Sequence, residues 1–304
     1  MSSASTMTVA ALQFSFGEDL EENVAKVEAG AEEAARAGAN VILPSELFEG
    51  PYFPTLEHAA AFDLAHPLEN HPTIARMARL AKSFGVAIPV SFFERAGQAF
   101  YNSVAMVGPT GEVEGLYRKS HIPDGPGYEE KYYFRPGDTG FRVWSTPWGA
   151  VGVGICWDQW FPEAARAMVL MGADLLFYPT AIGTEPEEPD LDTSRPWQRV
   201  MIGHAVANIA PVVAANRVGR ESRQEFYGHS FIADSLGEKV AELGPSEEGV
   251  LTAELDLALV RARRAAFGFF RDRRPDLYGI LGTADGCLPI SAPPPDRESG
   301  EGAS

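Results

Sequence analysis

The 304-residue chain is 45% hydrophobic, which is enough for a sizeable core. Its 25 basic and 42 acidic residues give a net charge of −17, which disfavours a nucleic-acid partner and favours a small cationic ligand. Two cysteines, Cys156 and Cys287, exclude a disulfide framework or a zinc cluster, so we expect a reduced, cytoplasmic protein. No apolar run approaches the ~20 residues that cross a bilayer and no secretion signal opens the chain, so no membrane association is expected.

Short β-rich runs alternate with longer Ala- and Glu-rich runs along the chain, which is typical of an α/β fold. In the first half, strands are predicted at residues 8–14, 40–46 and 86–94, and helices at 19–38 and 72–85. Two further β-rich runs, 101–108 and 112–119, flank Pro109-Thr110-Gly111 and predict an antiparallel hairpin.

The second half of the chain repeats this alternation. Strands are predicted at residues 149–156, 173–179, 210–219, 229–234, 238–244 and 250–255, and helices at 162–172 and 195–208, with a basic helix after the last strand. Crossovers together with hairpins indicate mixed sheets, and two similar halves favour a layered αββα sandwich. We expect residues 1–7 to be a flexible N-terminus, 8–281 a single domain and 282–304 a disordered tail.

Three reactive side chains follow predicted strands, where the chemistry of α/β sheets is usually found. Glu46 ends the run NVILPSE, Lys119 ends EVEGLYRK, and Cys156 ends GAVGVGIC. Each has an ordinary structural alternative: a loop acid, a solvated lysine and a small packed core residue. None of the three predicts a catalytic site by itself.

The surroundings of Cys156 favour a reactive role. Glycines thin the strand before it, and Trp157-Asp158 turns the chain before Pro162, a residue suited to the first position of a helix. A cysteine at this turn lies near a helix N-terminus, where the dipole and free N–H groups favour a thiolate and bind an oxyanion. Glu46 and Lys119 are chemically suited to act as its base and as a stabilising positive charge. None of the candidate histidines, which are His121, His204 and His229, lies in a papain-like motif.

With these residues identified, the chain resembles the nitrilase superfamily of carbon–nitrogen hydrolases from about residue 8 to about residue 280. Three motifs carry the resemblance: LPSELF (43–48), YRKSHIPDG (117–125) and GICWDQWFPEAAR (154–166). The resemblance implies a four-layer αββα sandwich with mixed β-sheets that packs further into a homo-oligomer, a dimer or larger. It implies neither a metal nor a cofactor.

The resemblance also assigns roles to individual residues. It implies that Glu46 is the general base, Lys119 an electrostatic stabiliser and Cys156 the nucleophile. A second glutamate often assists in this superfamily and matches Glu130 in the segment GYEEKYYFRPGD. Taken alone, Glu130 would be interpreted as a solvated acid.

Within the superfamily, residues 124–141, 181–188 and 197–219 are similar to the branch that hydrolyses N-carbamoylputrescine in polyamine synthesis. Hydrolases of N-carbamoyl-β-alanine and N-carbamoyl-D-amino acids and aliphatic amidases share the triad and remain alternatives, as does a non-catalytic binding protein on this fold. A substrate carboxylate needs arginine or similar donors, whereas a primary ammonium needs acidic or aromatic partners.

The segment EPEEPDLD (185–192) places five acids after a predicted strand, on the side of the sheet where Cys156 emerges. Its first residue, Glu185, is the best candidate to bind the ammonium, although a solvated acidic loop is the alternative. Four aromatic residues near the triad are predicted to line the aliphatic part of the substrate channel, with core packing as the alternative for each: Tyr52, Phe53, Tyr128 and Trp157.

Two arginines and the C-terminal region bear on the remaining expectations. If Arg195 or Arg217 points into the pocket, an acidic substrate becomes the better prediction. The apolar segment AAFGFFRD (265–272) is a plausible oligomer contact, with core packing equally favoured. The tail position of Cys287 argues against a second catalytic role.

Overall fold

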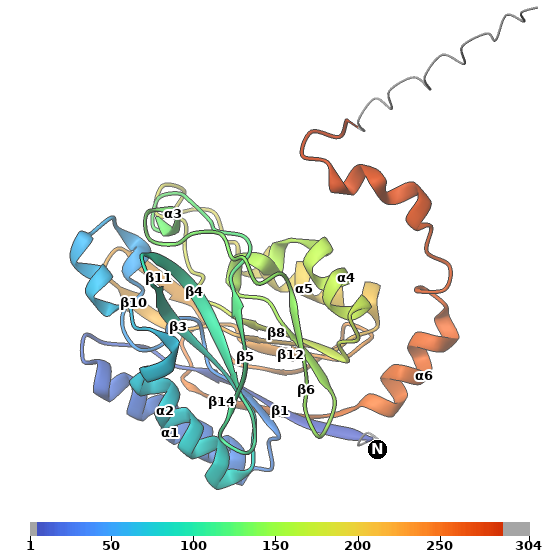
Figure 1. Cartoon of the computed structure of the whole chain (residues 1–304), viewed down its shortest axis with the longest axis horizontal. Coiled ribbons are helices and arrows are strands. Elements are labelled where there is room, and N and C mark those ends of the chain that lie inside the picture. The colour runs from blue at the N-terminus through green and yellow to red at the C-terminus, as the bar shows by residue number, and fades with distance from the viewer. Residues whose placement is uncertain (1–4, 288–304) are drawn as a thin grey trace, which may run out of the picture.

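The computed structural model describes residues 5–287 and arranges them as two layers of β-strands flanked by helices (Figure 1). In the first layer, the strands lie in the order β14 (Gly249–Asp256), β1 (Thr6–Gln13), β2 (Val41–Leu43), β3 (Ile88–Ala96), β4 (Ala99–Val107) and β5 (Val113–Arg118). The second layer has the order β13 (Lys239–Glu242), β12 (Phe231–Ala233), β9 (Val212–Ala215), β8 (Leu175–Pro179), β7 (Ala150–Val153) and β6 (Arg142–Ser145). The hairpin of β10 (Val218–Glu221) and β11 (Gln224–Tyr227) stands apart from both layers.

Helices cover the outer faces of both layers. Figure 1 shows α1 (Leu20–Arg36) and α2 (Pro72–Phe84) on one side, and α4 (Pro162–Leu170) and α5 (Ser194–Asn208) on the other. The remaining helices are α3 (Glu130–Tyr133), α6 (Leu257–Phe267) and the 3-10 helices η1 (Phe53–Thr55), η2 (Ala59–Leu64), η3 (Leu68–Asn70), η4 (Cys156–Trp160) and η5 (Pro275–Gly282). Within residues 5–287, none of the helices combines the length and apolar character needed to cross a membrane.

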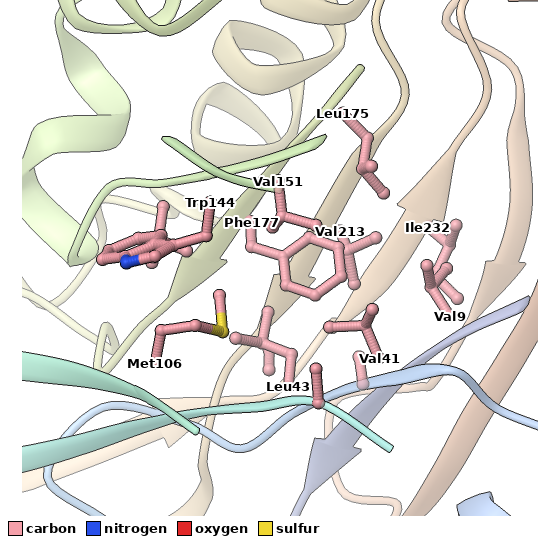
Figure 2. Close-up of a cluster of buried hydrophobic side chains, with 14 of the residues drawn as sticks. Val9, Val41, Leu43, Met106, Trp144, Val151, Leu175, Phe177, Val213 and Ile232 are labelled. Carbon is pink, nitrogen blue, oxygen red and sulfur yellow. The ribbon is translucent and has the colours of Figure 1, made fainter. Parts of the chain in front are cut away.

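Three hydrophobic cores hold these four layers together. The central core lies between the sheets and includes Val9, Met106, Phe177 and Val213 (Figure 2). A second core joins α1 and α2 to the first sheet, and a third joins α4 and α5 to the second sheet. Strand β1 contributes alternate side chains to the first two cores, because successive residues of a strand point to opposite faces. A strand buried on both faces is continuously apolar, as the sequence is at this strand.

The predicted αββα sandwich is confirmed, and both sheets are mixed. Strand β1 pairs parallel with β2 and antiparallel with β14, while β7, β8 and β9 are parallel and β6 and β12 flank them antiparallel. The hairpin around Pro109-Thr110-Gly111 is confirmed as β4 and β5. Helix α1 begins after Asp19, whose carboxylate accepts from the amides of Glu21 and Glu22, so a side-chain cap sets its start.

Several predicted boundaries were wrong. Thr6 and Met7 are not a flexible lead-in: both belong to β1, opposite β14, and Met7 is fully buried. Strands β2 and β7 end at Leu43 and Val153, three residues before the candidate catalytic side chains that were expected to close them. The predicted tail falls mostly on residues 288–304, which lie outside the described residues.

Candidate active site

The three candidate catalytic side chains meet at one end of the sheets, and Lys119 lies at their centre. Its ammonium donates to Glu46 Oε1 at 2.9 Å and to both carboxylate oxygens of Glu130, at 2.8 and 2.7 Å. The side chains of Lys119, Glu46 and Glu130 are all fully buried. Glu130 is therefore not the solvated acid that its sequence neighbours suggest, because α3 turns it inward.

Burial and charge pairing set the protonation of this cluster. Burial lowers the pKa of Lys119, but Glu130 and Glu46 outweigh burial and raise it above its usual range. The pKa of Glu130 rises to about 7, because desolvation outweighs the opposing charge of Lys119. One ammonium thus lies between two carboxylates and can balance the charge of only one of them.

Cys156 occupies a strained turn beside these groups. It starts η4 with a φ of 42°, a left-handed conformation that is uncommon for residues other than glycine. Its Sγ lies 3.8 Å from the carbonyl oxygen of Ala181. Burial, followed by the charge of Glu46, raises the pKa of the thiol well above its ordinary value, although Lys119 acts in the opposite sense. Burial and the charge of Glu46 therefore oppose the thiolate that the position near a helix N-terminus was expected to favour.

Asp158 holds the turn that carries Cys156; the sequence predicted a turn at this residue but not the contacts of its carboxylate. Its fully buried carboxylate accepts from the Ile155 amide at 2.9 Å and the Tyr117 hydroxyl at 2.7 Å. It also accepts from the His121 amide at 3.0 Å, with the ring Nδ1 of His121 at 2.7 Å. One side chain thus ties the cysteine turn to the segment after Lys119. The only signal in the sequence was an acid two residues after the cysteine.

The loop of Glu46 is held by two further residues without a predicted role in catalysis. Asn102 donates from Nδ2 to Glu46 Oε1 at 2.6 Å. Arg217 is fully buried and donates to the Glu46 and Leu47 carbonyls at 2.7 and 2.9 Å, while its other nitrogen pairs with Glu221 at 2.7 Å. Arg217 is thus committed to an internal acid and to backbone rather than to the pocket.

A cavity of about 340 Å³ opens over Cys156. Three predicted binding residues, Tyr128, Trp157 and Glu185, line it. Asp124 lines it as well, which the sequence analysis missed, and no lysine or arginine is among the described residues of its wall. Arg195 is exposed and is not part of the wall either. The cavity therefore presents acids and aromatic rings, and burial together with Glu188 raises the pKa of Glu185.

Two predicted channel residues lie elsewhere. Tyr52 is almost fully buried, and its hydroxyl donates to Glu130 at 2.5 Å, so it contacts a candidate catalytic carboxylate instead of lining the channel. Phe53 stacks on Phe93 at a ring distance of 5.0 Å. It lines a separate cavity of about 300 Å³ beside Leu47, which contains none of the candidate catalytic side chains. Tyr52 and Phe53 lie in different environments because the chain turns into η1 between them.

Comparison with known proteins agrees with this geometry. Residues 8–265 match the family model described as carbon-nitrogen hydrolase. The chain belongs to the carbon–nitrogen hydrolase family. An N-carbamoylputrescine amidase from Arabidopsis thaliana is 56% identical to this hydrolase over 290 residues, which cover 93% of this chain and 97% of the relative. A citrullinase from Francisella tularensis is 50% identical over 274 residues, or 89% of this chain and 96% of the relative.

Solved structures share the fold of this hydrolase. A carbon-nitrogen hydrolase from Helicobacter pylori G27 superposes with a TM-score of 0.86 at 36% identity, covering 92% of this chain and 99% of the other. An amidase from Nesterenkonia sp. AN1 superposes with a TM-score of 0.75 at 25% identity, covering 91% and 97% of the two chains. That amidase shows covalent addition of the acetamide moiety of fluoroacetamide at its active-site cysteine.

Proposed function

We propose that this hydrolase converts N-carbamoylputrescine to putrescine, carbon dioxide and ammonia, a step of polyamine biosynthesis. The similarity to curated N-carbamoylputrescine amidases supports the reaction. The observation that carries the substrate choice is the wall of the cavity over Cys156, where Asp124 and Glu185 supply negative charge. Acids and aromatic rings suit a primary ammonium, whereas a carboxylate would need a cationic partner.

In the proposed first step, Glu46 takes the proton of the Cys156 thiol while sulfur attacks the ureido carbonyl carbon. The carbonyl electron pair moves to oxygen, and Lys119 and the Trp157 amide stabilise this oxyanion. Collapse of the tetrahedral intermediate breaks the bond to the terminal nitrogen. Protonated Glu46 gives its proton to that nitrogen, so ammonia leaves and a thiocarbamate remains on Cys156.

Water completes the proposed cycle. Glu46, assisted by Glu130, takes a proton from a water molecule that attacks the thiocarbamate carbon. The carbon–sulfur bond breaks, the thiol regains its proton, and the released carbamate decays to carbon dioxide and putrescine. No metal or cofactor takes part in these steps.

Citrulline is the second candidate, because a citrullinase is 50% identical to this chain. Citrulline and N-carbamoylputrescine have the same number of atoms between the ureido group and the amine, and differ by one carboxylate beside that amine. Two acids in the wall of the cavity repel this carboxylate, with no described arginine or lysine beside them to bind it. The ratio of kcat/KM for the two substrates therefore measures the effect of this one group.

The test is a comparison of kcat/KM for N-carbamoylputrescine, citrulline and N-carbamoyl-β-alanine. We expect N-carbamoylputrescine to be the best substrate by about 10²-fold or more, as one unpaired charge in a partly buried site costs several kcal/mol. The variant Glu185→Gln should raise KM for N-carbamoylputrescine, and Glu187→Gln, which changes an exposed acid on the same loop outside the cavity wall, is its matched control. A higher kcat/KM for either carboxylate substrate would refute the substrate choice.

The nucleophile is tested separately. Cys156→Ala should abolish hydrolysis of every ureido substrate, whereas Cys287→Ser should leave it unchanged, because Cys287 is exposed and far along the chain. Intact mass of the wild type after reaction with a slow substrate should reveal one carbamoyl adduct that is absent from Cys156→Ala. Full activity in Cys156→Ala would remove the covalent mechanism.

We also infer that the hydrolase forms a homo-oligomer and acts in the cytoplasm, where its free thiols stay reduced. The segment from Phe267 to Leu281 extends away from the sandwich (Figure 1), and both of these side chains are exposed, as is Met171 at the end of α4. Phe270 packs instead on the core beside Arg166, so the segment 265–272 combines core packing with exposed apolar side chains, and the exposed ones support the proposed oligomer contact. Light scattering of Phe267→Glu should show a smaller species than the wild type.

A further inference from the structure

The two carboxylate oxygens of Glu46 lie in different environments. Oε1 accepts from the amide nitrogen of Asn102 at 2.6 Å and from the Lys119 ammonium at 2.9 Å. Oε2 is buried and has no hydrogen-bond partner among the described residues. A buried carboxylate oxygen without a partner is costly, and natural structures retain few of them. This asymmetry requires an explanation.

Asn102 creates the asymmetry from a fixed position in the first sheet. It lies in β4 opposite Phe93 of β3 and is fully buried. Its backbone carbonyl accepts from the Lys119 amide at 2.8 Å. The residue therefore fixes the backbone of the lysine with its main chain and the carboxylate of Glu46 with its side chain. Any residue at this position retains the first contact, but only a side chain with a suitably placed donor can make the second.

The orientation of the Asn102 amide follows from charge. If Oδ1 faced Glu46, two acceptors would lie at hydrogen-bond distance, which is repulsive. Oδ1 instead points away and has no hydrogen-bond partner among the described residues. The side chain thus donates one hydrogen bond and accepts none. The presence of an asparagine here is therefore not explained by a fully hydrogen-bonded amide.

We propose that Asn102 is a positioning residue that occupies Oε1 of Glu46 together with Lys119, so that Oε2 is the atom that accepts the Cys156 proton. The inference rests on the proposed role of Glu46 as base. Oε1 already accepts from two donors, while Oε2 retains its lone pairs. Without Asn102, the carboxylate is held by the Lys119 ammonium alone, and rotation about its last bond would exchange the two oxygens.

The proton transfer balances at these atoms. The Sγ–H bond of Cys156 breaks, its electron pair stays on sulfur, and an O–H bond forms at Oε2 of Glu46. The sulfur pair then forms the bond to the carbonyl carbon, and the Oε2 proton later passes to the departing nitrogen. Asn102 and Lys119 remain on Oε1 throughout, so the carboxyl group needs no reorientation between accepting and giving the proton.

The test uses the full-length chain with Cys287→Ser, so that Cys156 is the only thiol. Two variants are made in this background. Asn102→Leu removes the Nδ2 donor at similar side-chain volume, and the isosteric Asn102→Asp replaces the Nδ2 nitrogen with an oxygen. Asn208→Leu is the matched control, because Asn208 is also buried, donates once from Nδ2 to the His204 carbonyl, and leaves Oδ1 without a partner among the described residues.

Two measurements are made on each protein. The first is the rate at which iodoacetamide alkylates Cys156, followed by intact mass; this reaction releases the thiol proton and needs no natural substrate. The second is kcat and KM for whichever ureido compound the parent hydrolyses best. We expect both Asn102 variants to lose about 10²-fold in alkylation rate and in kcat, with KM changed by less than about threefold. Asn208→Leu should keep both rates within about threefold of the parent while losing comparable thermal stability.

The outcomes separate this inference from the proposed function. If the parent hydrolyses no ureido compound but Asn102→Leu still slows alkylation, the substrate proposal fails and the positioning role stands. Alkylation in folded Asn102→Leu within about threefold of the parent overturns the positioning role. If Asn102→Leu does not fold, the same criterion is applied to Asn102→Asp. Equal losses in the Asn208 control would also overturn it, since they would reflect general damage to the fold.

Discussion

Arg217 offers a direct test of how the loop that carries Glu46 is held. The guanidinium pairs with Glu221 and donates to the carbonyls of Glu46, Leu47 and Gly50 at 2.7, 2.9 and 3.2 Å. Replacement by methionine leaves the buried Glu221 carboxylate without its counter-charge and three carbonyls without this donor. Breaking a buried ion pair from one side costs about 3 to 5 kcal/mol. We therefore expect Arg217→Met to lower the free energy of unfolding by that amount.

For a chain of this length, 1 kcal/mol corresponds to roughly 1.5 to 2 °C in Tm, so the expected decrease is about 5 to 10 °C. The assay is thermal and denaturant unfolding of four proteins: the wild type, Arg217→Met, Glu221→Gln and the double variant. Because the second substitution removes the stranded charge, the double variant should be more stable than the sum of the two single losses predicts, by about 1 to 3 kcal/mol.

Additive losses in this cycle would refute the ion-pair reasoning, as would a loss below about 1 kcal/mol for Arg217→Met. The same variant bears on substrate choice. Since Arg217 already binds an internal acid and backbone carbonyls, its replacement should lower kcat without improving or impairing the discrimination between N-carbamoylputrescine and citrulline. A selective loss of citrulline turnover would show that the arginine contacts substrate.

Three further predictions follow from single contacts. The hydrogen bond from Tyr52 lowers the pKa of Glu130, so Tyr52→Phe should raise that pKa above about 7 and shift the acidic limb of the kcat/KM profile to higher pH; an unmoved profile would contradict this. Burial raises the pKa of Glu49 from 4.5 to about 7, so its contribution to stability is present below pH 4.5 and is lost as pH rises through 7. Glu49→Gln should therefore change its stability difference from wild type by up to about 3 kcal/mol between these pH values in denaturant titrations, and parallel pH curves would argue against this. A Cβ on Gly183 would lie 2.1 Å from the Glu225 carbonyl oxygen, so Gly183→Ala should displace the loop before Glu185 and raise KM about tenfold, and an unchanged KM would show that the loop tolerates the shift.

The fold was accessible from the sequence because it depends on local patterns. The alternation of strands and helices, the turn at Pro109-Thr110-Gly111 and the two similar halves of the chain predicted the layered sandwich, and the structure confirms it. The strand ends were less accessible. Glu46 and Cys156 continue an apolar run in sequence but lie in turns. The first turn is held by a long-range bond from the Leu47 amide to Ser91, and the second by a local bond from the Ile155 amide to Asp158.

The candidate catalytic side chains could be selected from the sequence by itself, since Glu46, Lys119 and Cys156 stand in motifs that can be compared directly. Their supporting residues were not. Asn102, Asp158 and other buried polar side chains resemble ordinary strand and loop residues until the structure places a donor against a carboxylate or a carboxylate against a turn.

The charges near the cavity were also predicted only in part from the sequence. The sequence determined that the chain is acidic and that Glu185 follows a strand near the cysteine, but it left open whether an arginine would face the substrate. Only the tertiary structure decided this, by pairing Arg217 with Glu221 and leaving Asp124 and Glu185 in the wall of the cavity. The physical reason is that a buried charge is defined by all of its partners: Glu221 is only four residues from Arg217, but the Glu46 and Leu47 carbonyls that Arg217 also binds lie 171 and 170 residues away, where no local pattern joins them.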